Sequence, residues 1–182
     1  MSNREKRVEI NHVHLYLALS RPSQGEKADC IRTIDKGGEH ELDFLIAKLK
    51  IIGGYWRIHR TVNARDVQKA RIWLMKDLLD HPEHASYIDS QWRTALLQPE
   101  CKTTNFFMLD IDTQDEEKIT RIRELLAGIY RHEEIKSPKG WHIICDPFDT
   151  RELLQTFPND ITLLRDGYYF ICEVGEKNEK RI

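Results

Sequence analysis

The order of strand-type and helix-type runs after residue 104 most constrains how this chain can fold. An apolar run at 105–111 is followed by residues 115–130, where Ile119, Ile122 and Leu126 lie at helical spacings. The remaining runs are of strand type at 131–136, 140–148, 160–164 and 167–174 and of helix type at 149–157. We therefore predict the order strand, helix, strand, strand, short helix, strand, strand, with Asp149 as N-cap of the second helix.

This order predicts a split βαβ unit followed by a second such unit, which form an antiparallel sheet with helices on one face and the other face free. The arrangement is ferredoxin-like, or RNA-recognition-motif-like (RRM-like). The predicted fold class is α/β of the α+β type. An N-terminal α/β unit, residues 1–103, is expected to pack on an RRM-like βαββαβ unit, residues 104–182, in one compact body.

The first half has no internal repeat, and its apolar periodicity predicts a mixed α/β layer. We expect strands at 7–22 and 55–63, a loop or short hairpin at 23–41, and helices at 42–54, 64–82 and 85–100. The buried stripe of the 64–82 helix is predicted to consist of Val67, Ala70, Ile72, Trp73, Leu74, Leu78 and Leu79.

Charge and composition favour no partner on their own. The 182 residues include 28 basic and 30 acidic side chains, a formal net charge of −2, so attraction to nucleic acid requires local clustering. The first ten residues are too polar for a secretory signal, and no apolar run approaches the roughly 18 residues of a membrane span. We expect a cytoplasmic protein. Its four cysteines form no C-x-x-C pair, so neither a zinc knuckle nor a disulfide framework is indicated.

The sequence FMLDID places two carboxylates at the end of the first strand of the second half. Because side chains alternate along a strand, Asp110 and Asp112 are expected to project to the same side while Ile111 faces the core. The two like charges repel unless a cation lies between them, and Mg²⁺ takes oxygen ligands from one or two carboxylates plus substrate phosphates. The alternative is a strand that ends in an ordinary polar loop.

A second motif, SPKGWH, precedes and enters a later strand. Ser137 to Gly140 are predicted to form a turn, after which Trp141 and Ile143 lie on one face and His142 on the other. A lone histidine in a strand is more often a surface residue or a hydrogen-bonded structural residue than a catalytic one.

Together these two motifs, in this order on a βαββαβ unit, resemble the archaeo-eukaryotic primase superfamily, which includes the primase-polymerases. The resemblance is at the level of motifs and covers residues 104–175. It implies that Asp110 and Asp112 bind Mg²⁺ or Mn²⁺ and that Ser137, Lys139 and His142 contact an incoming nucleotide. A third catalytic and metal-binding carboxylate is assigned to Asp160. The alternative, Asp166, lies in an Asp-Gly turn, where aspartate has a purely conformational reason to occur.

The strand at 55–63 adds candidate phosphate ligands. Arg57 and His59 share one face of this strand, and Arg60 lies where the chain leaves it. Because guanidinium groups bind phosphates through paired hydrogen bonds, both arginines are predicted to bind nucleotide phosphates. A helix N-terminus near Ala64 would add oriented amides. The alternative is a polar strand face that meets water.

The reaction implied by the resemblance is nucleotidyl transfer from a nucleoside triphosphate to a 3′-hydroxyl of single-stranded or primed DNA or RNA. The chain is short for a primase with accessory domains, so we expect it to depend on other replication or repair proteins. One alternative is a non-catalytic RRM-like module that binds nucleotides or nucleic acid, although an RNP1 pattern is missing. Another is a nuclease or phosphohydrolase that uses the same carboxylates.

The aromatic residues and a histidine pair offer two further candidate groups. Trp141 and Tyr168 are the aromatics that we expect to stack on bases, while Phe170 is expected in the core. His12 and His14 share a strand face, but no matching Cys/His set lies nearby in the sequence, so zinc ligation by this pair is not favoured.

Overall fold

The computed structural model describes residues 11–20, 27–37 and 40–176. The elements of the first half are β1 (His12–Ser20), β2 (Cys30–Asp35), α1 (Glu41–Ile52), β3 (Trp56–Thr61), β4 (Arg65–Asp66), α2 (Val67–Asp80), the 3-10 turn η1 (Pro82–Tyr87), α3 (Ile88–Leu96) and a second 3-10 turn, η2 (Pro99–Cys101). Those of the second half are β5 (Phe107–Ile111), α4 (Glu116–Leu125), β6 (Arg131–Lys136), β7 (Trp141–Cys145), α5 (Arg151–Thr156), β8 (Ile161–Leu164) and β9 (Tyr168–Val174). The outer parts of the predicted 7–22 strand, before residue 11 and after residue 20, lie outside the described residues, as do 23–26 and 38–39 of the predicted loop.

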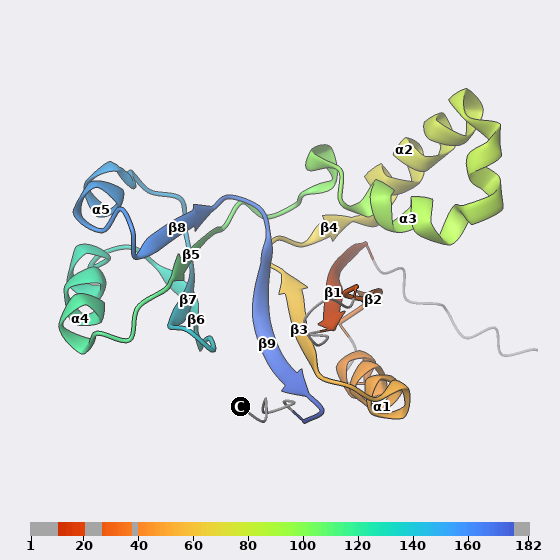
Figure 1. Ribbon diagram of the computed structural model, residues 1–182. Helices are drawn as coiled ribbons and strands as arrows, with labels where there is room; N and C mark the ends of the chain where they lie inside the picture. The colour runs from red at the N-terminus through yellow and green to blue at the C-terminus, as the bar shows by residue number, and fades with distance from the viewer. Residues whose placement is uncertain (1–10, 21–26, 38–39, 177–182) are drawn as a thin grey trace, which may run out of the picture.

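The second half forms the predicted ferredoxin-like unit. Its antiparallel sheet has the order β6-β7-β5-β8, and α4 and α5 cover one face, on the left of Figure 1. Leu109, Ile111, Ile143 and Cys145 alternate toward these helices and form the core between the sheet and the helix layer. Burial raises the pKa of the Cys145 thiol to about 11, as expected for a cysteine that packs as a small apolar residue.

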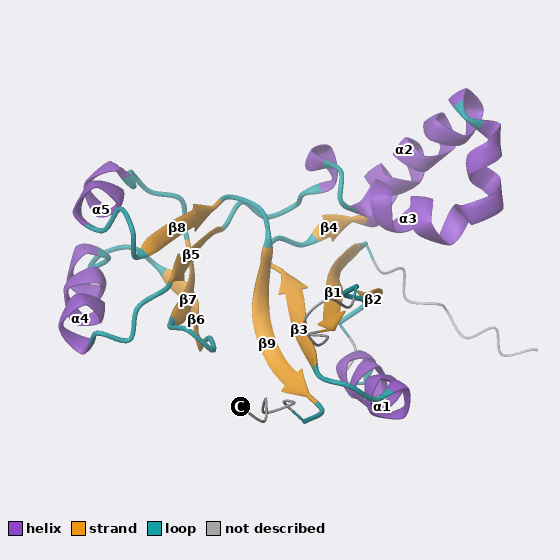
Figure 2. Ribbon diagram, in the orientation of Figure 1, coloured by secondary structure: helices purple, strands orange, loops and turns teal. Residues whose placement is uncertain are grey.

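The other antiparallel sheet lies beside the RRM-like sheet and has the order β2-β1-β3-β9, with the short β4 paired to β1 (Figure 2). We call it the first sheet, because the first half of the chain supplies all its strands except β9. Helix α1 covers one of its faces through Leu45 and Leu49. The segment 23–41, predicted as a loop or short hairpin, contains the strand β2, which pairs with β1 in antiparallel register.

The final strand crosses from the second half of the chain to the first sheet. β9 pairs with β3 and not with the RRM-like sheet. The predicted boundary at residue 103 therefore assigns the strands up to β8, which ends at Leu164, to the correct sheet, whereas β9 belongs to the sheet of the first half. The register between β3 and β9 shifts at this contact: Cys172 lies opposite Ile58, whereas Phe170 lies opposite His59. The extra residue, Ile171, is a β-bulge, a feature that bends a strand and re-aims its neighbours.

The face of the RRM-like sheet that was expected to be free packs partly against the first sheet. A buried cluster joins Met108 and Ile144 of the RRM-like sheet to Val62, which follows β3, and to Tyr169 of β9. Apolar side chains on that face are better buried than hydrated, so β9 and the end of β3 cover them. Asp110, Asp112 and His142 lie beside this apolar cluster and line a cavity.

Helices α2 and α3 form an arm at the upper right of Figure 1. Helix α2 begins at Val67 because the Asp66 carboxylate accepts hydrogen bonds from the amides of residues 68 and 69. The prediction that Ile72 and Leu79 belong to the buried stripe is wrong, since these side chains are 56% and 80% exposed. The arm contacts the sheet mainly near its base, through the cluster around Ala70, and neither Ile72 nor Leu79 belongs to that cluster.

Among the described residues, no helix combines the length and the apolar character needed to cross a bilayer.

Candidate functional site: a pocket between the two sheets

A cavity of about 190 Å³ lies where the end of β5 meets β3 and β9. Its lining residues are Arg57, His59, Asp110, Asp112, Ser137, Pro138, Lys139, His142 and Phe170. The RRM-like sheet supplies the carboxylates, the turn after β6 and His142, whereas the other sheet supplies Arg57, His59 and Phe170. Residues that are far apart in the sequence therefore line one pocket, which we call the carboxylate pocket.

The two aspartates lie on one side of the chain, as predicted. Asp110 is on β5, and Asp112 follows the strand, where its amide donates to the carbonyl of Asp160 at 2.8 Å. The buried Ile111 between them holds the strand end against the core. The Asp110 side chain is 31% exposed, so water or a ligand can reach its oxygens. Two hard oxygen donors that face a pocket fit a Mg²⁺ or Mn²⁺ ion that takes its other ligands from phosphates and water.

His142 lies directly opposite Asp110 in the β5–β7 pairing, and its Nε2 is 3.1 Å from Asp110 Oδ1. The other ring nitrogen, Nδ1, accepts a hydrogen bond of 3.0 Å from the backbone amide of Phe170. An amide N–H can only donate, so Nδ1 carries no proton and the neutral ring has its proton on Nε2. Nε2 lies 3.1 Å from the Asp110 carboxylate and so can help to orient it, as outer partners do for metal-binding carboxylates.

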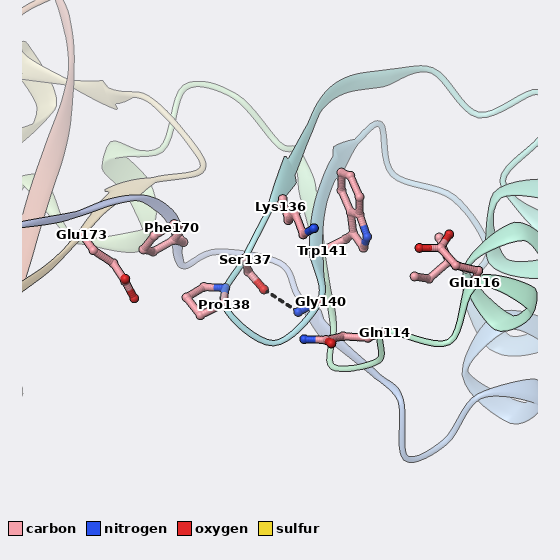
Figure 3. A pocket seen from close by; sticks show the side chains of 10 residues that line it. Gln114, Glu116, Lys136, Ser137, Pro138, Gly140, Trp141, Phe170 and Glu173 are labelled. Atoms are coloured by element: carbon pink, nitrogen blue, oxygen red, sulfur yellow. Dashed lines mark hydrogen bonds between the residues drawn. The ribbon is translucent and has the colours of Figure 1, made fainter. Parts of the chain in front are cut away.

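The turn at 137–140 is held against the end of β5. The Gly140 amide donates to Ser137 Oγ at 3.1 Å, and the Ser137 amide donates to the Gly140 carbonyl at 2.9 Å (Figure 3). A Cβ atom at Gly140 would lie 1.9 Å from the carbonyl oxygen of Ile111, so a glycine is needed for this close approach. The turn carries Lys139 into the carboxylate pocket.

Arg57 is the cation that β3 contributes. Its Nε donates to Glu173 Oε1 at 3.2 Å, and the two residues lie opposite each other on β3 and β9. A guanidinium has five N–H donors, so one bond to a carboxylate leaves capacity for an oxyanion. Arg57 and Lys139 give the pocket two cations beside its two aspartates, a balance that suits a polyanion bound together with a metal ion.

A larger cavity of about 510 Å³ adjoins the carboxylate pocket and shares Ser137, Pro138 and Phe170 with it. Figure 3 shows Phe170 and Glu173 on one side of the turn, with Trp141 and Glu116 on the other. Its volume lies within the range of small-molecule sites.

The aromatics of this larger cavity correct one sequence prediction. Phe170 was expected in the core, but it lines both cavities. Trp141 does line the larger cavity, and the Arg123 guanidinium lies 5.0 Å from its ring centroid. Tyr168 does not line either cavity; it packs against the cluster at the base of the arm.

The structure does not bring the predicted third carboxylate into the carboxylate pocket. Both oxygens of Asp160 accept from Lys118 Nζ at 2.9 Å. The alternative, Asp166, accepts from the buried Arg65 at 2.7 Å. Within the described part of the chain, Asp110, Asp112 and Asp160 do not form a group of three closely spaced ligand atoms.

Arg60 is also directed elsewhere. Its Nε donates to the buried Asp35 at 2.7 Å and its Nη1 to the Tyr169 hydroxyl at 3.2 Å. Burial and the neighbouring Asp35 carboxylate raise the pKa of Tyr16 to about 12. Arg60 is thus engaged by a network with Asp35 and Tyr169 and does not line the carboxylate pocket. The helix N-terminus that was expected near Ala64 lies at Val67 instead, and the Asp66 side chain accepts hydrogen bonds from its first free amides.

Three residues that line these cavities were not among the predicted site residues: His59, Phe170 and Glu173. They depend on β9 joining β3, a pairing between segments more than 100 residues apart. One feature of the sequence could have pointed to this site: the charged Glu173 interrupts an otherwise apolar strand. Its position opposite Arg57 follows only from the register between β3 and β9.

No family model matches the chain, and neither a curated protein nor a solved structure is significantly similar to it.

Proposed function

We propose that this chain is a primase-polymerase-like nucleotidyltransferase core. In this proposal it binds a nucleoside triphosphate with Mg²⁺ or Mn²⁺ and transfers a nucleotide to the 3′-hydroxyl of DNA or RNA. The single observation that carries the proposal is the convergence of Arg57, Asp110, Asp112, Lys139 and His142 on one pocket. Four of these five residues belong to motifs that resemble those of the archaeo-eukaryotic primase superfamily.

Each residue has a role that follows from its position. Asp110 and Asp112 would hold the cation, and His142 would keep the Asp110 carboxylate turned toward it through its Nε2 proton. Arg57 and Lys139 would bind phosphate oxygens from the two sides of the pocket. The bound cation would supply charge neutralisation for an in-line phosphoryl transfer. The adjoining cavity, with Trp141 and Phe170, has room for the nucleoside.

The proposed substrates are a nucleoside triphosphate and single-stranded or primed nucleic acid. Other replication or repair proteins are proposed as further partners. It places the activity in the cytoplasm, where nucleotides and nucleic acid are available.

The test is incubation of the chain with labelled nucleoside triphosphates, Mg²⁺ or Mn²⁺, and primed or unprimed DNA. Asp110→Ala is run beside it, and Asp149→Asn serves as a control because that carboxylate is on the surface and pairs with Arg151. Extension that Asp110→Ala abolishes and Asp149→Asn retains supports the proposal. Extension that persists in Asp110→Ala refutes it.

The ion pair between Asp160 and Lys118 favours a second candidate function. If this carboxylate stays with Lys118, the pocket has two acidic ligands, which suffice for nucleotide binding or hydrolysis without strand extension. In the same experiment, labelled diphosphate or monophosphate without longer strands identifies hydrolysis. Retention of intact triphosphate on the protein identifies a binding module.

A further inference from the structure

A second group of side chains that can bind a metal ion lies at the corner between α2 and α3, and none of them lines the carboxylate pocket. His81, Glu83 and His84 place one ligand atom each within 4.8 Å of the others. The imidazole rings of His81 and His84 have centroids 4.9 Å apart, and His81 Nδ1 is 3.8 Å from Glu83 Oε1. Figure 1 shows this corner at the outer end of the helical arm.

The backbone at this corner holds the three residues on one short turn. The His81 amide donates to the Asp77 carbonyl at 2.8 Å and ends α2, and the His84 amide donates to the His81 carbonyl at 3.0 Å. Pro82 fixes the backbone between them at the start of the 3-10 turn. A ligand set on one such turn loses little conformational entropy when an ion binds, because its backbone is already ordered.

Asp77 provides a separate observation that points to a metal. Its Oδ2 lies 2.7 Å from His84 Nδ1, and the side chains of Asp77 and His84 are 12% and 22% exposed. A neutral His84 that donates its Nδ1 proton to this carboxylate keeps a lone pair on Nε2. Metal-binding histidines almost always have a carboxylate or carbonyl partner of this kind on the other ring nitrogen.

We propose that His81, Glu83 and His84 bind a divalent transition-metal ion of the Zn²⁺ class, with Asp77 as the positioning residue for His84. Two imidazoles and one carboxylate are a ligand set that zinc accepts with water in its fourth position. Mg²⁺ prefers oxygen ligands, so the ion at this corner differs from the one proposed for Asp110 and Asp112. The bound ion would fix the corner where α2 ends and the turn toward α3 begins.

This inference does not rest on the proposed function, and its test keeps the two sites separate. The full chain, without an affinity tag and with Asp110→Asn and Asp112→Asn introduced, is titrated with Zn²⁺ against a chromophoric chelator. We expect one Zn²⁺ per chain. His81→Ala and His84→Ala should each weaken binding by at least 100-fold, and Asp77→Asn by about 10- to 100-fold. His81 is largely exposed, so its replacement leaves the fold intact, which circular dichroism with EDTA verifies.

Two controls address other sources of affinity. His40→Ala removes an exposed histidine outside the corner and Cys30→Ser removes an exposed thiol, and both should bind Zn²⁺ as the parent does. Substitution with Co²⁺ should give the visible bands of a nitrogen–oxygen site without the near-ultraviolet thiolate band. Unchanged affinity in His84→Ala, or loss of binding in His40→Ala or Cys30→Ser, would overturn the proposal. A thiolate band would do the same.

Discussion

Asp110 and His142 lie directly opposite each other on β5 and β7, with Nε2 of the imidazole 3.1 Å from Oδ1 of the carboxylate. The Phe170 amide on β9 donates a hydrogen bond to Nδ1 of this imidazole. The sheet that contains β9 therefore sets the orientation and the tautomer of the ring. The carboxylate pocket therefore depends on the two sheets remaining in contact. A substitution that weakens this contact is expected to change the pocket as well as the fold.

The first prediction concerns the proton on His142 Nε2. His142→Ala should weaken binding of a nucleoside triphosphate with Mn²⁺ by about 1.5 to 3 kcal/mol, the cost of losing a hydrogen bond to a charged group. His142→Gln should restore part of the loss, since its side-chain amide can still donate toward Asp110. Titration calorimetry measures both. His132→Ala is the control, because that ring pairs with Asp146 outside the pocket; an equal loss there would contradict the prediction.

The second prediction is that Arg57 and His142 act on the same ligand. Arg57→Ala should weaken nucleotide binding by about 1.5 to 3 kcal/mol, as a charge-assisted contact does. The double variant should lose less than the sum of the two single losses, with a coupling of at least about 0.5 kcal/mol. Both residues line the carboxylate pocket, so they are close enough to couple. Strict additivity in a calorimetric double-mutant cycle would count against a shared ligand.

The third prediction concerns metal binding at the aspartates. The chain should bind Mn²⁺ weakly alone and more tightly with a triphosphate present, because phosphate oxygens complete the ligand set. Asp112→Asn should remove this gain and raise the melting temperature of the ligand-free protein, since it relieves repulsion between two neighbouring carboxylates. Calorimetry and thermal unfolding measure the two effects. Equal Mn²⁺ affinity of both proteins with nucleotide present would eliminate this site.

The fourth prediction concerns the close approach of the 137–140 turn to β5. Gly140→Ala places a Cβ atom 1.9 Å from the Ile111 carbonyl oxygen and 2.8 Å from that of Thr113, so the turn or the strand end must move. We expect a loss of stability of about 1 to 3 kcal/mol together with weaker nucleotide binding. Gly167→Ala is the matched control, because its nearest contact would be an ordinary 3.6 Å. Urea unfolding of the two variants checks the difference.

The fifth prediction concerns pH and stability. Burial and, to a lesser extent, the Arg60 charge lower the pKa of His14 below its ordinary value of 6.5. At pH values between the lowered pKa of the folded state and the ordinary pKa of 6.5, His14 binds more protons in the unfolded chain than in the folded one. This residue therefore makes the free energy of unfolding fall as the pH drops below about 6.5. His14→Gln should flatten the dependence between pH 5 and 7, whatever its effect at neutral pH. An unchanged slope in urea unfolding at a series of pH values would contradict this assignment.

Local patterns in the sequence determined the order of elements in the second half and the direction of its strand side chains. The alternation in FMLDID and GWHIIC separated Asp110 and His142 from the core-facing Ile111 and Trp141, because a strand has a strict period of two. The structure has the same division, with Ile111 in the helix-covered core and both Asp110 and His142 in the pocket. Such features follow from neighbours within a few residues.

Tertiary structure alone decided which partners the charged side chains take. Asp160 pairs with Lys118, 42 residues away, and Arg60 with Asp35, 25 residues away. These choices depend on how α4 packs beside β8 and how β2 pairs in the first sheet. Sequence spacing does not encode either distance, and a charged group near several partners binds the one that the packed backbone brings within reach.

The crossing of β9 to the first sheet was likewise beyond the sequence, and it supplies Phe170 and Glu173 to the site. A strand-type run predicts an extended segment but not the edge with which it pairs, since either sheet could satisfy its backbone hydrogen bonds. Burial of the apolar cluster between the sheets favours the observed pairing. The sequence by itself thus determined the aspartate and histidine motifs, and only the tertiary structure decided what surrounds them.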